Sequence, residues 1–168
     1  MDNHLSTPVR DPALRTELRA ELRDLHDDYA AALDDLDFAS WIGFFTEGCV
    51  YRVVSLENFN QGLPLSTMEC HGLGSLRDRV AAIRETAVFE PRTLRRIVSG
   101  TRINAVDREI RAQASFAIFE SLSDREPHLF MTGRYLDRVT RDGGRLKLRE
   151  RVCVYDNYRV RTSLVYPV

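Results

Sequence analysis

The chain has 168 residues, of which 43% are hydrophobic and 29% charged, and its formal net charge at pH 7 is −1. This length and composition predict a single globular domain that buries a core of its own. A nearly neutral chain has no strongly basic field, so neither nucleic acid nor an anionic membrane is expected as a partner. Lys147 is the only lysine among the basic residues. Either codon usage or a need for buried or interfacial guanidinium groups explains that excess of arginine.

The three cysteines, Cys49, Cys70 and Cys153, are odd in number and lack CxxC spacing. This pattern indicates a reducing compartment and not a disulfide framework. No apolar run approaches the roughly 20 residues of a membrane span, and the first residues lack the apolar core of a signal peptide. We therefore expect a cytoplasmic protein.

The N-terminal part predicts a long helix. Residues 1–10 show no periodicity and are expected to form a flexible arm, which leaves residues 11–168 as the domain. Asp11 and Pro12 are typical of an N-cap and the first helical position. An apolar stripe follows at steps of three and four: Leu14, Leu18, Leu22, Leu25, Tyr29, Leu33 and Leu36. It predicts a helix of about 25 residues, whose first half packs either on its own domain or on a neighbouring subunit.

The stretch from residue 29 to residue 63 is expected to organise the fold. Asp37 is a good N-cap for a second, short helix. Trp41, Phe44 and Phe45 fall on one side of that helix. Residues 49–54 predict the first strand, and residues 55–66, rich in Asn, Gly and Pro, predict a loop.

A second strand is expected within residues 65–71, followed by a break at residues 72–74. Ser75 is expected to cap the next helix, with Asp78 completing a capping box. Residues 94–106, 110–118, 129–139 and 146–154 then predict four long strands, and Asp142-Gly143-Gly144 is a hairpin signal. This order favours an α+β fold, with helices packed on one face of a strongly curved, mainly antiparallel sheet around a conical cavity.

Metal and phosphate motifs are missing from the sequence. The four histidines are dispersed, and no cysteine or carboxylate joins them at ligand spacing. There is also no glycine-rich phosphate loop and no GxSxG motif. The sequence predicts no redox centre held by this chain alone.

An acid–base site inside the cone is the main alternative chemistry. Its candidate residues are Tyr29, Asp34 or Asp35, Tyr51, His71 and Glu150. Glu150 alternates in phase with Leu148 and Val152, and a carboxylate on an apolar face must either be paired or shift its pKa upward. It is therefore either a general base or the partner of an arginine on a neighbouring strand.

A set of motifs, in their order and spacing, resembles the small (β) subunit of aromatic-ring-hydroxylating dioxygenases. The matching residues are Tyr29-x3-Leu33-Asp34, Trp41-x2-Phe44-Phe45-Thr46-Glu47-x-Cys49-x-Tyr51-x-Val53, Asn58-x3-Gly62-Leu63-Pro64, Leu76-x-Asp78-Arg79-Val80, Arg84, Glu90-Pro91, Gly133-x-Tyr135-Leu136-Asp137 and Leu146-x-Leu148-x-Glu150-Arg151-x-Cys153. Residues 133–137 and 145–156 look most like members that act on aromatic carboxylates such as terephthalate or salicylate. The chain departs from the family pattern at Gly48, where Asp is common, and at Arg96, where His is frequent.

The resemblance implies a cone-shaped fold like that of nuclear transport factor 2, within the SnoaL-like superfamily. It also implies an α3β3 hexamer in which the α subunit carries a Rieske [2Fe–2S] cluster and a mononuclear iron. The β subunit of such a hexamer holds no cofactor and no catalytic residue.

On this interpretation the chain is the non-catalytic structural subunit of a ring-hydroxylating oxygenase that takes part in aromatic-compound catabolism. The residues expected to contact partner subunits are Asn58, Gly62, Leu63, Arg77, Asp78, Arg79, Tyr166 and Pro167. Two alternatives remain open. One is a stand-alone isomerase or dehydratase that uses Tyr29, Asp34, His71 or Glu150, and the other is a non-enzymatic dimerising module with a filled cone.

Overall fold

The structure is a computed structural model that describes residues 12–85, 90–157, 160 and 164–168. The predicted arm, residues 1–10, and the predicted cap at Asp11 lie outside these residues. The elements, in chain order, are α1 (Pro12–Asp34), α2 (Phe38–Gly43), β1 (Phe45–Ser55), α3 (Leu56–Asn60), β2 (Met68–His71), α4 (Gly72–Glu85), β3 (Arg92–Val106), β4 (Ile110–Leu122), β5 (His128–Asp142) and β6 (Arg145–Tyr155).

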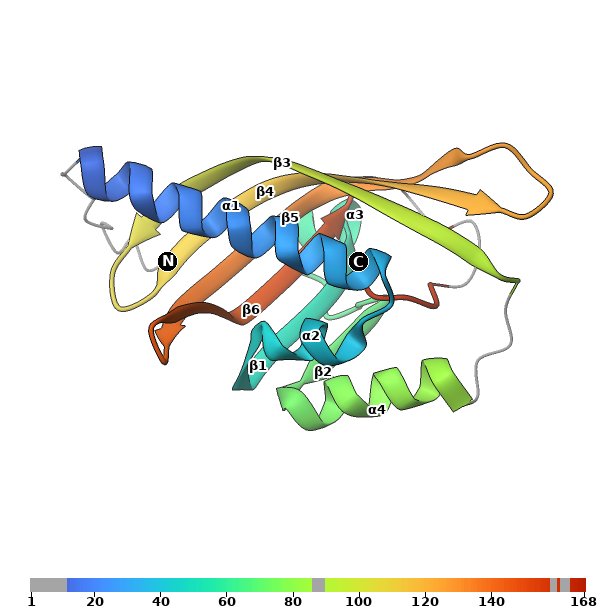
Figure 1. Ribbon diagram of the computed structural model, residues 1–168, viewed down its shortest axis with the longest axis horizontal. Helices are drawn as coiled ribbons and strands as arrows, with labels where there is room; N and C mark the ends of the chain where they lie inside the picture. The colour runs from blue at the N-terminus through green and yellow to red at the C-terminus, as the bar shows by residue number, and fades with distance from the viewer. Residues whose placement is uncertain (1–11, 86–89, 158–159, 161–163) are drawn as a thin grey trace.

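The strands form one six-stranded sheet in the order β2-β1-β6-β5-β4-β3. The β1–β6 pair is parallel and the other neighbouring pairs are antiparallel. Figure 1 shows α1 and α2 lying across one face of the curved sheet, with α4 beside the β1–β2 edge and α3 on the opposite side. This architecture confirms the predicted α+β fold with helices over a curved, mainly antiparallel sheet.

Helix α1 follows the predicted stripe as far as Leu33. Leu18, Leu22, Leu25 and Leu33 are buried within the chain, whereas Leu14 is 53% exposed. The prediction for Leu36 is wrong, because this residue lies outside the helix, is exposed, and has a positive φ of 57°. There its N–H donates to the carbonyl of Leu33, and the N–H of Asp37 donates to that of Ala32, which is the hydrogen-bond pattern of a Schellman motif.

Helix α2 begins where the sequence predicts, because the Asp37 carboxylate accepts a hydrogen bond from the backbone N–H of Ser40 at 3.1 Å. It presents Trp41 to the interior, where the indole contacts Phe45 and Tyr51 edge-on at centroid separations of 5.5 and 5.7 Å. Tyr29 of α1 joins the same group. These fully buried rings form the core between the helices and the sheet.

Three local predictions are corrected by the structure. Helix α2 ends at Gly43, so Phe44 and Phe45 lie beyond it, and Phe45 begins strand β1. The predicted loop contains helix α3, because the Ser55 hydroxyl accepts from the N–H of Asn58 and so caps a helical turn. Helix α4 begins at Gly72, so Ser75 lies inside it and is not its N-cap. Gly72 has a positive φ of 75°, and this lets the chain turn out of β2 directly into the helix.

The β5–β6 hairpin confirms the predicted turn at residues 142–144. Gly143 and Gly144 both have positive φ angles, 58° and 80°, as a type I′ turn requires. Strand β5 pairs with β6 from Gly133↔Tyr155 at one end to Asp142↔Arg145 at the other. The hairpin forms the central pair of the sheet.

Gly133 of β5 packs closely against its two neighbouring strands, β4 and β6. A Cβ atom at this position would lie 2.2 Å from the carbonyl oxygen of Val154, 2.7 Å from Cζ of Phe116 and 2.9 Å from Cα of Tyr155. Two of these neighbours are backbone atoms of the adjacent strand, which cannot move without breaking the sheet. Only glycine fits at this position.

We expect Gly133→Ala to lower the free energy of unfolding by about 2–3 kcal/mol, because the added methyl group forces strand displacement in a close-packed core. Urea unfolding followed by circular dichroism measures the change. Gly48→Ala is the matched control, because this glycine is also in a strand and its added Cβ meets nothing within 4 Å. Equal losses for both variants would contradict this account of Gly133.

Candidate functional site

The structure does not bring the candidate acid–base residues together. Tyr29 and Tyr51 lie inside the cone and are fully buried. The carboxylate of Asp34 is bound to Arg96 at 2.6 Å. His71 is exposed at the surface, where its Nε2 lies 2.8 Å from Glu69 Oε1. The predicted set of cavity acids and bases is therefore not assembled.

Glu150 lies on the opposite face of the sheet from the one that its sequence phase predicts. Arg138 pairs with Glu150, but the next residue, Val139, pairs with Leu148. Arg149 is thus an extra residue that forms a β-bulge and reverses the in–out alternation. On the outer face Glu150 forms an ion pair with Arg138, whose Nε lies 2.9 Å from Glu150 Oε2. The interpretation of Glu150 as an ion-pair partner is confirmed, and the interpretation as an apolar-face general base is wrong.

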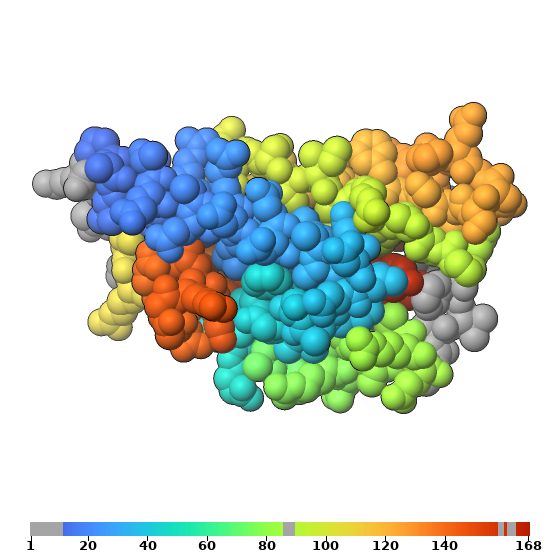
Figure 2. Space-filling view, viewed as in Figure 1, coloured from blue at the N-terminus to red at the C-terminus, as the bar shows by residue number. Residues whose placement is uncertain are grey.

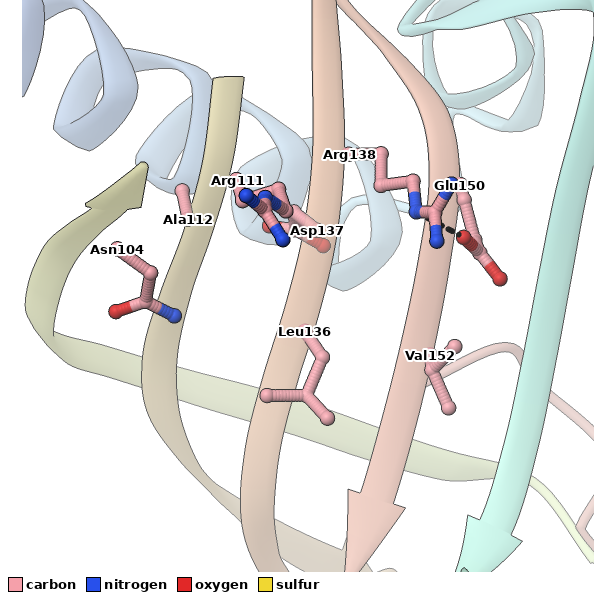
Figure 3. A pocket seen from close by; sticks show the side chains of 8 residues that line it. All are labelled: Asn104, Arg111, Ala112, Leu136, Asp137, Arg138, Glu150 and Val152. Carbon is pink, nitrogen blue, oxygen red and sulfur yellow. Dashed lines mark ion pairs between the residues drawn. The ribbon is translucent and has the colours of Figure 1, made fainter. Parts of the chain in front are cut away.

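This region forms an open pocket of about 180 Å³ on the outer face. Figure 3 shows Leu136 and Val152 as its apolar part and the Arg138–Glu150 pair at one end. The nearby Arg111 is itself paired with Asp107 at 3.1 Å. The pocket therefore offers balanced charges on an open surface. It has no arrangement of groups for acid–base chemistry.

The bulge places Arg151 where Glu150 was predicted to lie. The Arg151 guanidinium is fully buried and binds the Asp137 carboxylate through two hydrogen bonds, Nε to Oδ1 at 2.9 Å and Nη2 to Oδ2 at 2.8 Å. His26 of α1 approaches the same carboxylate, with Nε2 2.9 Å from Oδ2, and its Nδ1 lies 3.1 Å from Thr101 Oγ1. This network connects α1 to strands β3, β5 and β6.

Two aromatic rings enclose the buried cation. The guanidinium carbon of Arg151 lies 4.0 Å from the ring centroid of Tyr29 and 4.2 Å from that of Tyr135. A cation between two π faces in a dry interior gains about 2 kcal/mol or more from each favourable contact. The aromatic rings and the Asp137 carboxylate together replace the water that the guanidinium loses.

The ionisation states in this interior follow from burial and charge. Burial raises the pKa of Asp137, but the attraction of Arg151 and the hydrogen bonds from Arg151 and His26 outweigh it and lower the pKa to about 2. Burial raises the pKa of Tyr29 to about 12 and that of Tyr51 well above its ordinary value. At neutral pH the interior therefore holds a carboxylate, a guanidinium and protonated phenols that can donate hydrogen bonds.

The chain's own tail enters the cone beside these groups. The Val168 side chain is fully buried, and its carbonyl accepts from Tyr29 Oη at 2.8 Å and from Tyr51 Oη at 3.2 Å. In Figure 2 only a small red area, the colour of the tail, is visible beside α2. The cone is filled by side chains and by this segment.

The residues predicted to contact partners fall into two groups. Gly62, Leu63, Arg77 and Asp78 are exposed, and Asn58 and Arg79 are half-buried. In contrast, Tyr166 stacks on Phe38 inside the chain, and the carbonyl of Pro167 accepts from Arg96. The side chains of Tyr166 and Pro167 are buried in this chain and face away from solvent.

The loop after α3 is the most apolar of the exposed predicted segments. Phe59, Leu63 and Leu65 are 38%, 38% and 60% exposed, and they lie within seven residues of one another in the sequence. Asn58, Gly62 and Leu63 help to line an open groove of about 420 Å³. A cluster of exposed apolar side chains beside a groove is typical of a surface that binds another protein.

Within residues 12–85, 90–157, 160 and 164–168, no group of three or more His, Cys, Asp or Glu residues has a geometry that could hold a metal ion. The helices of the same residues include none whose length and apolar character would let it span a membrane.

The sequence and structure match those of known proteins. Residues 14–152 match the SnoaL-like domain family. The anthranilate 1,2-dioxygenase small subunit of Burkholderia cepacia is 33% identical over 149 residues, which cover 88% of this chain and 92% of that protein. The terephthalate 1,2-dioxygenase terminal oxygenase component subunit beta 1 of a Comamonas species is 30% identical over 141 residues, covering 83% and 92% of the two chains.

A solved structure gives the same result. The beta subunit of a candidate aromatic-ring-hydroxylating dioxygenase from Novosphingobium aromaticivorans superposes with a TM-score of 0.84 at 30% identity, covering 92% of this chain and 99% of that one. The chain therefore belongs to the SnoaL-like family and, within it, to the small subunits of aromatic-ring-hydroxylating dioxygenases. The resemblance stated from the motifs is confirmed.

No prediction from the sequence gave His26, Asp137 or Arg151 a role in the interior, although signals for them exist. His26 lies one turn before Tyr29 and one turn after Leu22 on the buried stripe of α1. Asp137 alternates in phase with the buried Tyr135 and Val139. Arg151 alternates with Cys153 and Tyr155, which are buried too, but the bulge hid this relation to the residues before it.

We expect Asp137→Asn to lower the free energy of unfolding by about 3–5 kcal/mol, because it leaves the buried Arg151 cation without its counter-charge. Glu150→Gln is the matched control, since its ion pair with Arg138 joins the same two strands on the outer face and is partly exposed. That change should cost no more than about 1 kcal/mol. Urea unfolding of both variants gives the comparison, and similar losses would contradict the assigned burial.

The same carboxylate predicts an acid-dependent loss of stability. Because the pKa of Asp137 falls from its ordinary value of 3.8 to about 2 on folding, its contribution is fully present above pH 3.8 and is lost as the pH falls from 3.8 toward 2. The difference in unfolding free energy between the unmodified chain and Asp137→Asn should therefore shrink over this range. A difference that stays constant from pH 5 to pH 2 would show that Asp137 does not titrate in this way.

Proposed function

We propose that this chain is the non-catalytic, structural β subunit of a ring-hydroxylating oxygenase that takes part in the catabolism of an aromatic carboxylate. One observation carries the proposal that the chain is non-catalytic. The interior, where the fold would hold a ligand, is occupied by the Arg151–Asp137–His26 network and by the tail. The substrate class is supported by the relatives, whose names give anthranilate and terephthalate as substrates.

The proposed partner is a large oxygenase subunit of the Rieske type. It would carry the [2Fe–2S] cluster and the mononuclear iron, and three copies of each subunit would form an α3β3 hexamer in the cytoplasm. The small-subunit names of the relatives support the existence of a larger partner. The iron chemistry belongs to that partner, and the role of this chain is to hold the large subunits in register.

The loop after α3, which includes Asn58, Gly62 and Leu63, is the proposed contact with other subunits, together with Arg77 and Asp78 of α4. Its exposed leucines and Phe59 provide the apolar area that a stable interface needs. Arg79 is a weaker choice, because its guanidinium already donates to the carbonyl oxygens of Leu164 and Val165. Tyr166 and Pro167 are left out of the proposed interface, since the side chains of both are buried within this chain.

We expect the chain purified alone to show no visible absorbance and no bound iron. Co-expressed with the large subunit of its own system, it should elute as one large brown complex containing both chains. Size-exclusion chromatography with iron analysis and a visible spectrum tests this expectation. Separate elution of the two folded subunits would overturn the proposed function.

We expect Leu63→Asp to reduce co-purification with the large subunit at least about tenfold, because burying a new carboxylate in an interface costs more than the roughly 1.4 kcal/mol that a tenfold change represents. Leu36→Asp is the matched control, since Leu36 is also an exposed leucine but lies between α1 and α2, the two helices that Figure 1 shows on the other side of the sheet from α3. Quantitative pull-down with a tagged large subunit measures both. Loss of binding in both variants, or in neither, would remove the loop from the interface.

A further inference from the structure

The tail Leu164–Val168 is held by side chains, in the way that a protein holds a bound peptide. It pairs with no strand in the described structure. Instead, Arg79 of α4 donates to the carbonyl oxygens of Leu164 and Val165 at 2.8 and 2.6 Å. Arg96 of β3 donates to the carbonyl oxygen of Pro167 at 2.6 Å.

Val168, at the inner end of the tail, accepts hydrogen bonds from several side chains. The phenol hydroxyls of Tyr29 and Tyr51 both point to the carbonyl oxygen of Val168, and the Cys153 thiol lies 3.6 Å from it. The N–H of Val168 donates in turn to Tyr51 Oη at 2.7 Å. Carbonyl and amide of one residue are thus both recognised, by side chains from α1, β1 and β6.

Apolar contacts complete the recognition. The ring of Tyr166 stacks on Phe38 at a centroid separation of 6.3 Å and an interplanar angle of 22°. The Val168 side chain is buried in the same core as Trp41 and Phe45. The contacts are therefore of two kinds, polar to the backbone and apolar to the side chains, as in peptide-binding sites.

The walls also hold more donors than the tail uses. Among the described residues, Trp41 Nε1, Tyr135 Oη and Arg151 Nη1 are buried and have no hydrogen-bond partner. Trp41 lies in aromatic contact with both Tyr29 and Tyr51, and Tyr135 with Tyr29. Buried donors without partners are rare in proteins, and here all three belong to side chains that contact Tyr29, which binds the Val168 carbonyl.

We propose that the inner end of the cone is a binding site for a short apolar peptide segment and that the chain's own Leu164–Val168 occupies it as an internal ligand. Covalent attachment supplies only a high effective concentration of the segment. The recognition itself belongs to the side chains. The site will accordingly take the same segment as a separate peptide once its own tail no longer competes. This property concerns the isolated chain and its test needs no partner subunit, so it stands or falls independently of the proposed function.

The test uses a full-length variant in which residues 164–168 are changed to Gly-Ser-Gly-Ser-Gly, checked for folding by circular dichroism. The probe is a fluorescently labelled acetyl-Leu-Val-Tyr-Pro-Val amide, and fluorescence polarisation measures its binding. The variant should bind the peptide saturably, and the unmodified chain should bind at least about tenfold more weakly because its site is occupied. A folded variant that does not bind, or equal binding by both chains, overturns the proposal.

Two further substitutions, made in the tail variant, test the recognising groups. Tyr29→Phe with Tyr51→Phe should weaken peptide binding at least tenfold, because it removes both donors to the Val168 carbonyl. Tyr155→Phe is the matched control, since Tyr155 is a buried phenol of the same core whose hydroxyl lies 2.8 Å from Thr67 Oγ1. It should leave peptide binding unchanged, and equal losses in both would overturn the assignment.

If the Gly-Ser tail prevents folding, full-length Tyr166→Ser replaces that variant. It loosens the tail by removing the ring that stacks on Phe38 and leaves Tyr29 and Tyr51 intact. Peptide binding above that of the unmodified chain supports the proposal, and a folded Tyr166→Ser chain without such binding overturns it. Benzoate is the second probe. Binding of benzoate without binding of the peptide would assign the site to small aromatic acids and overturn the proposal as stated.

Discussion

The ion pair between Arg151 and Asp137 is the interaction on which the rest of the interior depends. Two charges removed from water are costly unless they are paired with good geometry and supported by further contacts nearby. Asp137 is therefore hydrogen-bonded to His26 of α1, and the Arg151 guanidinium packs between the faces of Tyr29 and Tyr135. Because Tyr29 is also on α1, the charged pair fixes the position of the long helix over the sheet at two points.

The placement of Tyr29 has a second effect. Its ring faces Arg151, and its hydroxyl reaches the carbonyl of Val168. One side chain thus links the ion pair of the sheet to the tail. In this chain the hydrogen bonds of the interior run among its own side chains and to the tail. Phe59, Leu63 and Leu65 are among the exposed apolar residues, and they lie together in one loop, where another subunit can cover them.

Much of the fold was predictable from local patterns. The leucine spacing gave α1, Asp37 gave the start of α2, and Asp142-Gly143-Gly144 gave the central hairpin, because each depends on residues close in sequence. Two of the wrong predictions involve features that no local pattern records. A single extra residue at Arg149 reversed the face of Glu150, and the positive φ of Gly72 moved the start of α4 from Ser75. The His26–Asp137–Arg151 network joins residues up to 125 positions apart, and only the assembled sheet brings them together. The family resemblance gave the function class, whereas the details of the site required the structure.

Besides its role in packing, Trp41 determines what the intrinsic fluorescence of the protein reports. It is the only tryptophan of the chain, it is fully buried, and it touches Tyr29 and Tyr51, the two residues that hold Val168. Light absorbed at the red edge of the protein spectrum therefore excites one chromophore, located at the inner end of the cone. The emission of Trp41 therefore depends on the hydration of that interior and does not report changes on the outer face of the sheet.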